Sequence, residues 1–156
     1  GSFIKQKQVL FKTFQNTTEI EKAFQLLKAK NISKLELTLL GKLNQEYSKS
    51  IVNTKTEIKT IAHFCKTLMG PSIGFDSFNN PEIGTVFITG PLATIFSREV
   101  SGKPLAVMSS GPYGIFRGIG ASETQATHFV KTLKRGQYVM IIRGFEYDLT
   151  SIQKIL

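Results

Sequence analysis

Cysteine and histidine are scarce in this chain, and their scarcity argues against several kinds of site. The sequence has 1 cysteine and 2 histidines. A single cysteine cannot form an intramolecular disulfide, which favours a reducing compartment, so we expect a cytoplasmic protein. A structural zinc site usually takes four ligands, and Cys65 with His63 and His128 falls short without carboxylates. The sequence therefore predicts no metal and no cofactor.

Long apolar runs are also missing. No stretch reaches the roughly 18 apolar residues that a membrane-spanning helix needs. The first residues lack a basic segment followed by an apolar one, so we expect no secretory signal. Gly1 and Ser2 are interpreted as a cloning remnant and are left out of the fold prediction.

Acidic residues are few relative to basic ones. The chain carries 20 Lys and Arg against 11 Asp and Glu, a net charge of +9. Such a surplus attracts polyanions, including nucleic acid, although it also increases solubility. The lysines are scattered along the sequence, with Lys5, Lys7 and Lys12 near the start and Lys131 and Lys134 near the end. This scatter does not indicate a dedicated binding groove.

The composition is that of one globular domain. Of 156 residues, 41% are apolar and 20% are charged. That length allows a substantial core. We predict a single α+β domain over residues 3–156, with an insert at 45–82 between two halves.

The opening residues predict a β-α-β unit. Val9–Phe14 has the composition of a strand, and Lys34–Leu40 alternates leucine with polar residues. Between them a helix begins near Thr18, with Glu21 in capping-box spacing. Its apolar face has i, i+3, i+4, i+7 spacing and consists of Ile20, Ala23, Phe24 and Leu27.

The closing residues repeat this pattern. Ser122 and Gln125 have the spacing of a capping box, and Gly136 can end the helix in a left-handed conformation. Tyr138–Ile142 is a run of β-formers. The apolar face of the predicted helix consists of Ala126, Phe129, Val130 and Leu133.

The middle of the chain is less regular. We expect a strand at Gly84–Gly90, and we expect 105–119 to be either a short helix or a glycine-rich connection. The remaining predictions are loops at 45–54 and 70–81, a helix at 57–69, and short helices at 91–99 and in the tail. Two β-α-β halves predict a ferredoxin-like sandwich, with a four-stranded antiparallel sheet and two helices on one face.

Two segments resemble the bacterial general-stress (heat-induced stress) protein family. Residues 83–93 are similar to its G-x-V-x-x-x-G-P-L-A segment. The closing match consists of Gly118, Ile119, Gly120, Ala126, Phe129, Lys134, Arg135, Gly136 and Val139. The family usually carries an apolar insert between its halves, whereas residues 54–66 here are amphipathic and charged. The resemblance implies a non-enzymatic, stress-linked role and no site residues.

The glycines before the closing helix are candidates for an anion site. Backbone N–H groups at a helix start can hold an anion, and a basic turn could assist. The candidate ligand-binding residues are Gly118, Gly120, Ser122, Lys134 and Arg135. The alternative is close packing of a turn against the sheet, which we favour because Ser122 already caps the helix.

Catalytic and nucleic-acid motifs are weak. His63 and Cys65 are two residues apart on a predicted helix, so they do not face each other. Phe11 and Phe14 point to opposite faces of their strand and cannot form one stacking platform. A four-stranded sheet with an open face could instead dimerise by sheet stacking.

These observations favour a non-enzymatic, stress-associated or regulatory module that acts through self-association, as a homodimer, or through a protein partner. One alternative is a small-molecule or anion binder that uses the glycine-rich 111–120 segment. A second is nucleic-acid binding through a basic surface.

Overall fold

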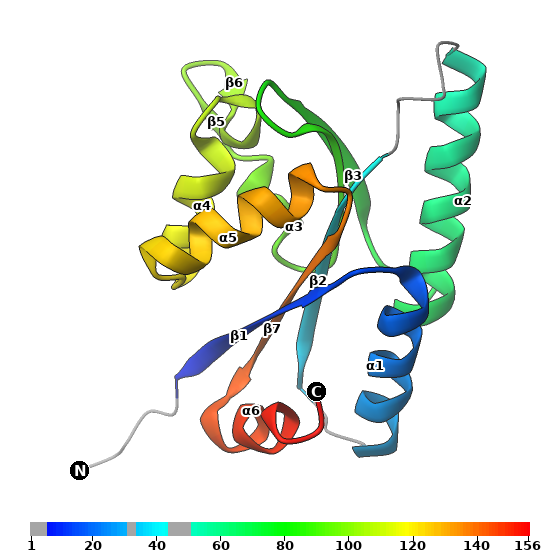
Figure 1. Ribbon diagram of the computed structural model, residues 1–156, viewed down its shortest axis with the longest axis vertical. Coiled ribbons are helices and arrows are strands. Elements are labelled where there is room, and N and C mark those ends of the chain that lie inside the picture. Colours follow the sequence, from blue (N-terminus) through cyan, green and yellow to red (C-terminus); the bar gives the residue numbers. More distant parts are fainter. Residues whose placement is uncertain (1–5, 31–33, 44–50) are drawn as a thin grey trace.

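An antiparallel sheet of five strands forms the centre of the molecule, in the order β1-β7-β2-β4-β3 (Figure 1). The structure is a computed structural model and describes residues 6–30, 34–43 and 51–156. The strands of the sheet are β1 (Lys7–Phe14), β2 (Glu36–Lys42), β3 (Phe75–Asn80), β4 (Gly84–Thr89) and β7 (Tyr138–Phe145).

Two β-α-β units interleave in this sheet. β7 pairs antiparallel with both β1 and β2, so β1 and β2 run parallel to each other with β7 between them. β2 in turn pairs antiparallel with β7 and β4, so β4 and β7 are parallel with β2 between them. The expectation of two β-α-β halves, and of an α+β class with an antiparallel sheet, is therefore confirmed.

Helices cover both faces of the sheet (Figure 1). One face carries α1 (Thr17–Lys30), α2 (Ile51–Met69) and α6 (Glu146–Gln153). The other carries α3 (Ala93–Phe96), α4 (Gly111–Ile119) and α5 (Glu123–Lys134), together with the short 3-10 helix η1 (Leu105–Val107). A small hairpin of β5 (Glu99–Val100) and β6 (Lys103–Pro104) lies between α3 and η1 in the chain.

The central strand β7 shows why both faces are covered. Val139 and Ile141 are buried in the core under α4 and α5, while Met140 and Ile142 are buried in the core on the opposite face. All four side chains are fully inaccessible to solvent. An unbroken apolar run is typical of a strand buried on two sides, whereas a strand with one wet face alternates apolar and polar residues.

The predicted ferredoxin-like sandwich, with four strands and one open face, is therefore not confirmed, because the sheet has five strands and helices on both faces. The fifth strand, β3, lies in the segment 70–81 that was expected to be a loop. Its sequence is mostly polar, and it is a strand because it pairs residue for residue with β4. The expected loop at 45–54 is also wrong over residues 51–54, which belong to α2, while 44–50 lie outside the described residues.

The predicted ends of α5 are confirmed, whereas the start of α1 is capped by Asn16 and not by Thr18, since the Asn16 side-chain oxygen accepts from the Glu19 N–H at 2.9 Å. The Ser122 hydroxyl accepts a hydrogen bond from the Gln125 backbone N–H at 3.1 Å, and the Gln125 side-chain oxygen accepts one from the Ser122 N–H at 2.9 Å. This is the capping box expected at the start of α5. Gly136, after its end, has the left-handed φ of 78°.

Candidate functional site

The five candidate ligand-binding residues do not form one site. Gly118 lies in α4 and Ser122 caps the start of α5, whereas Lys134 and Arg135 stand at the far end of α5. α5 has 12 residues, which at about 1.5 Å per residue separate its two ends by roughly 18 Å. The two cations therefore lie away from the three residues at the start of α5.

Gly120 has a structural role. Its φ of 131° lies in the region that favours glycine, and its backbone N–H donates to the carbonyls of Phe116 and Arg117. It ends α4 and allows the chain to turn directly into α5. Together with the internal capping of Ser122, this accounts for the helix junction without a bound anion.

A cavity of about 470 Å³ lies between the glycine-rich side of α4 and the sheet. We call it the basic pocket, because three cations stand among apolar side chains in its wall. It is lined by Lys7, Val9, Leu92, Ile95, Arg98, Leu105, Gly114, Ile115, Gly118, Ile119 and Arg143. The pocket lies where a ligand between the 111–120 segment and the sheet would be, which is the arrangement considered in the alternative of a small-molecule or anion binder.

Two glycines of α4 leave this pocket open. Gly114 and Gly118 are four residues apart, so they share one face of the helix. Both residues are exposed, and a Cβ atom at either position would meet no atom outside its own helix backbone within 4 Å. Both have ordinary helical backbone, since neither is among the residues with positive φ. Close packing therefore does not explain them. It does explain Gly111, which packs against η1 and whose Cβ would lie 1.8 Å from the Leu105 carbonyl oxygen.

The three cations reach the pocket from separate parts of the chain. The Lys7 Nζ lies 3.0 Å from one oxygen of Glu36, and the Arg143 Nη1 lies 3.4 Å from the other. The strand register sets this arrangement, because Arg143 pairs with Glu36 on one side and with Val9 on the other. Glu36 therefore holds two of the cations at the end of the sheet.

Arg98 is the third cation, and its backbone is fixed. Its N–H donates to the Ile95 carbonyl at 3.3 Å, and its carbonyl accepts from the Leu105 N–H at 2.7 Å. These bonds hold the base of the β5–β6 hairpin. The Arg98 guanidinium forms no ion pair with any residue in the described ranges. It is therefore a positive charge at the pocket that is available to a ligand.

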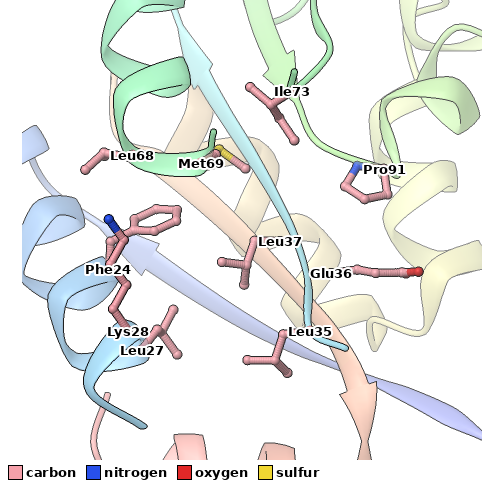
Figure 2. A pocket seen from close by; sticks show the side chains of 10 residues that line it. All are labelled: Phe24, Leu27, Lys28, Leu35, Glu36, Leu37, Leu68, Met69, Ile73 and Pro91. Atoms are coloured by element: carbon pink, nitrogen blue, oxygen red, sulfur yellow. The ribbon is translucent and has the colours of Figure 1, made fainter. Parts of the chain in front are cut away.

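A second hollow, the apolar cleft, lies on the opposite face of the sheet and has a volume of about 430 Å³. Figure 2 shows Leu35 and Leu37 of β2 pointing into it, while Glu36 projects from the other side of the strand. The cleft is lined by Phe24, Leu27, Lys28, Leu35, Glu36, Leu37, Leu68, Met69, Ile73 and Pro91. Glu36 is already paired with Lys7 and Arg143, so Lys28 is the one charged side chain of the described lining that has no ion pair.

The cysteine and the two histidines do not assemble into a reactive site. Cys65 is completely buried in the core beneath α2, and burial raises the pKa of its thiol to about 12. His63 and His128 are exposed. In the described part of the chain, no group of three or more His, Cys, Asp or Glu side chains is placed to hold a metal ion.

Raising the pH from 8 to 10.5 is expected to destabilise the wild-type protein more than its Cys65→Ala variant. In the unfolded chain the thiol ionises with a pKa near 9, whereas burial holds the folded pKa near 12. The contribution of the protonated thiol to the free energy of unfolding is therefore fully present below pH 9, and it is lost as the pH rises from 9 to 12. At 1.36 kcal/mol per pH unit, the extra loss at pH 10.5 is about 2 kcal/mol.

Urea unfolding of both proteins at the two pH values measures this difference. Tyr138 acts in the same direction, since burial and then the charges of Cys65 and Glu57 raise its pKa as well. Because Tyr138 is present in both proteins, most of its effect cancels in the comparison. Equal losses in the two proteins would show that the thiol ionises without unfolding.

Sequence reasoning missed the three cations of the basic pocket, although one signal was present. In β7 the residues Val139, Ile141 and Arg143 have the same parity and face the same side of the sheet. Arg143 follows the buried Val139 and Ile141 on the same face of the strand, so its charge indicates that the core ends there and a charged pocket begins. For Lys7 and Arg98 we find no comparable local signal.

No family model matches this chain, and searches of curated proteins and of solved structures give no significant match. The resemblance to the general-stress family therefore stays a prediction. No helix in the described ranges has both the length and the apolar character needed to span a membrane.

Proposed function

We propose that this chain is a non-enzymatic binding module that holds a small organic anion in the basic pocket. The observation that carries this proposal is the pair Gly114 and Gly118. Glycine costs about 1 kcal/mol relative to alanine inside a helix, and here neither backbone conformation nor packing requires it. The absent side chains instead leave room beside the cations of the pocket.

The chemistry of the pocket favours binding over catalysis. Its described lining contains cations and apolar residues, with no Ser, Cys, His, Asp or Glu side chain. Lys7, the one amine, is paired with Glu36. Acid–base or nucleophilic catalysis needs a reactive group within hydrogen-bond reach of a partner that activates it. A cationic, largely apolar cavity is suited to holding an anion in place.

The alternatives receive less support. Self-association by sheet stacking needs an uncovered sheet face. Here α4 and α5 cover one face, and α1, α2 and α6 cover the other. Phe11 packs against Phe129 with ring centroids 4.8 Å apart, so it does not offer a free platform for nucleic-acid bases. The family resemblance, which is itself a prediction, implies a stress-linked role, and we propose that anion binding serves that role.

Titration with 1-anilinonaphthalene-8-sulfonate, an apolar anion that fluoresces when bound, tests the proposal. We expect saturable binding to the wild type, and affinity at least tenfold lower in Gly118→Leu and in Arg98→Gln. Gly118→Leu fills open space and replaces glycine with a better helix former, so it should be at least as stable as the wild type.

Lys131→Gln is the matched control, because it removes an exposed cation of α5 that does not line the basic pocket. It should bind the dye as the wild type does. Unchanged affinity in Gly118→Leu would place the dye elsewhere and would contradict the proposal. Thermal unfolding of each variant verifies that the fold is retained.

A further inference from the structure

We infer that the anion held in the basic pocket is a phosphate monoester attached to an apolar chain. This inference rests on the proposed function and specifies its ligand. It draws on three properties of the pocket, which are the character of its walls, its net charge and the donors that its cations present.

The walls select an apolar body. Six of the lining residues have aliphatic side chains, namely Val9, Leu92, Ile95, Leu105, Ile115 and Ile119. Among the described lining residues there is no Asn, Gln, Ser or Thr side chain that could pair with a sugar or a base. Polar groups buried without hydrogen-bond partners weaken binding, whereas buried hydrocarbon strengthens it. A hydrocarbon chain therefore fits these walls better than a nucleotide or a sugar phosphate does.

The charge balance selects the head group. Lys7, Arg98 and Arg143 contribute three positive charges, and Glu36 contributes one negative charge, which leaves a surplus of two. A phosphate monoester carries a charge of about −1.5 to −2 at pH 7. It can therefore neutralise the surplus, whereas a single carboxylate would leave about half of it uncompensated.

The donors agree with this choice. A guanidinium presents its N–H groups in a planar fork that matches the oxygens of a phosphate. Arg98 forms no ion pair within the described residues, and Arg143 touches Glu36 through a single nitrogen at 3.4 Å. Both arginines therefore have donors left for a ligand. The Arg143 side chain is 43% exposed, so it can be reached from solvent.

Isothermal titration calorimetry at pH 8 tests the inference. The ligands are decyl phosphate, decanoate, decyltrimethylammonium and inorganic phosphate, and each amphiphile is kept below its critical micelle concentration. We expect decyl phosphate to bind at least tenfold more tightly than decanoate. Inorganic phosphate and the cationic amphiphile should each bind at least a hundredfold more weakly than decyl phosphate. At pH 5, where the phosphate loses its second negative charge, the advantage of decyl phosphate over decanoate should fall to less than threefold.

Two variants locate the binding. Arg98→Gln should weaken decyl phosphate at least tenfold, and Gly118→Leu should weaken all of the amphiphiles that bind. Lys131→Gln should leave the affinities unchanged. Decyl phosphate that binds equally well to Arg98→Gln would overturn the inference.

A second experiment distinguishes a phosphate ester that belongs to a membrane lipid from one that is soluble. Sedimentation with phosphatidylcholine vesicles, with and without phosphatidic acid, shows whether a lipid head group is taken from a bilayer. Binding to phosphatidic acid vesicles identifies a membrane source, and binding to decyl phosphate alone identifies a soluble one. Both results support the same ligand chemistry.

Failure of the inference and failure of the proposed function give different results. If decanoate binds as tightly as decyl phosphate and is lost in Gly118→Leu, the pocket binds anions but the phosphate assignment is wrong. If none of the anions binds and neither vesicle sediments the protein, both are wrong. Equal binding of decyltrimethylammonium and decyl phosphate would also overturn both, because the cations of the pocket would then play no part.

Discussion

Replacing Asn80 with aspartate is expected to lower the free energy of unfolding by about 4 kcal/mol, because one buried and one partly buried acceptor lose their donor at once. Asn80 is only 4% exposed. Its side-chain nitrogen donates to the carbonyls of Ala106 and Met108, both at 2.9 Å. Aspartate has no donor to offer when ionised, and it brings a negative charge against these oxygens.

This side chain joins the sheet to η1, whose Leu105 lines the basic pocket. Its oxygen accepts from the backbone N–H groups of Glu82 and Ile83, at 2.9 and 3.1 Å, in the turn between β3 and β4. The carbonyls on its other side belong to η1 and the residue after it, just before α4. We therefore expect Asn80→Asp to weaken ligand binding in the pocket as well as overall stability.

The neighbouring Asn79 provides the control for this substitution. The Thr85 hydroxyl donates to the Asn79 side-chain oxygen, and a carboxylate can accept the same bond. Asn79 is exposed, so Asn79→Asp should lower the free energy of unfolding by less than about 1 kcal/mol. Urea unfolding followed by circular dichroism measures both variants. Similar losses in the two would show that the Asn80 side-chain donor contributes little.

Gly90→Ala is expected to cost a similar amount, about 4 kcal/mol, through a clash that the backbone cannot avoid. Gly90 follows β4 and has a φ of 120°. An alanine Cβ would lie 2.3 Å from the Leu37 carbonyl oxygen and 2.7 Å from the Thr38 Cα. Both obstacles are main-chain atoms of β2, so relief requires the strand or the turn to move.

A substitution at Gly70 separates the cost of the backbone conformation from the cost of the clash with β2. Gly70 has almost the same φ, 113°, but a Cβ there would meet nothing within 4 Å. Gly70→Ala therefore reports the cost of the backbone conformation alone, which is about 1–2 kcal/mol. Thermal and urea unfolding of the two variants should differ by at least 2 kcal/mol. Equal losses would mean that the contact with β2 adds nothing to the conformational cost.

Much of the secondary structure could be predicted because its causes are local. The capping box of Ser122 and Gln125 joins residues three apart, and the apolar faces of α1 and α5 repeat within one or two turns. The predicted apolar faces are the buried ones, with the exception of Val130, which is only partly buried. Strand β3 was missed because its six residues carry little apolar alternation, and its conformation depends on β4.

The basic pocket could be predicted only in part. The sequence suggests a ligand beside the glycine-rich 111–120 segment, and Gly118 lines the pocket. Lys134 and Arg135, the two cations among the candidate residues, do not line the pocket. A twelve-residue helix carries those cations away from the glycines.

The sequence by itself determined α1, α5, most of α2, four strands of the sheet, the α+β class and the surplus of positive charge, because these follow from spacing and composition within short segments. The tertiary structure alone decided that the sheet has two covered faces and that Lys7, Glu36 and Arg143 meet. Lys7 and Glu36 are 29 residues apart in the chain, and Glu36 and Arg143 are 107 apart. Strand register brings such residues together, and register is fixed by the packing of the whole sheet.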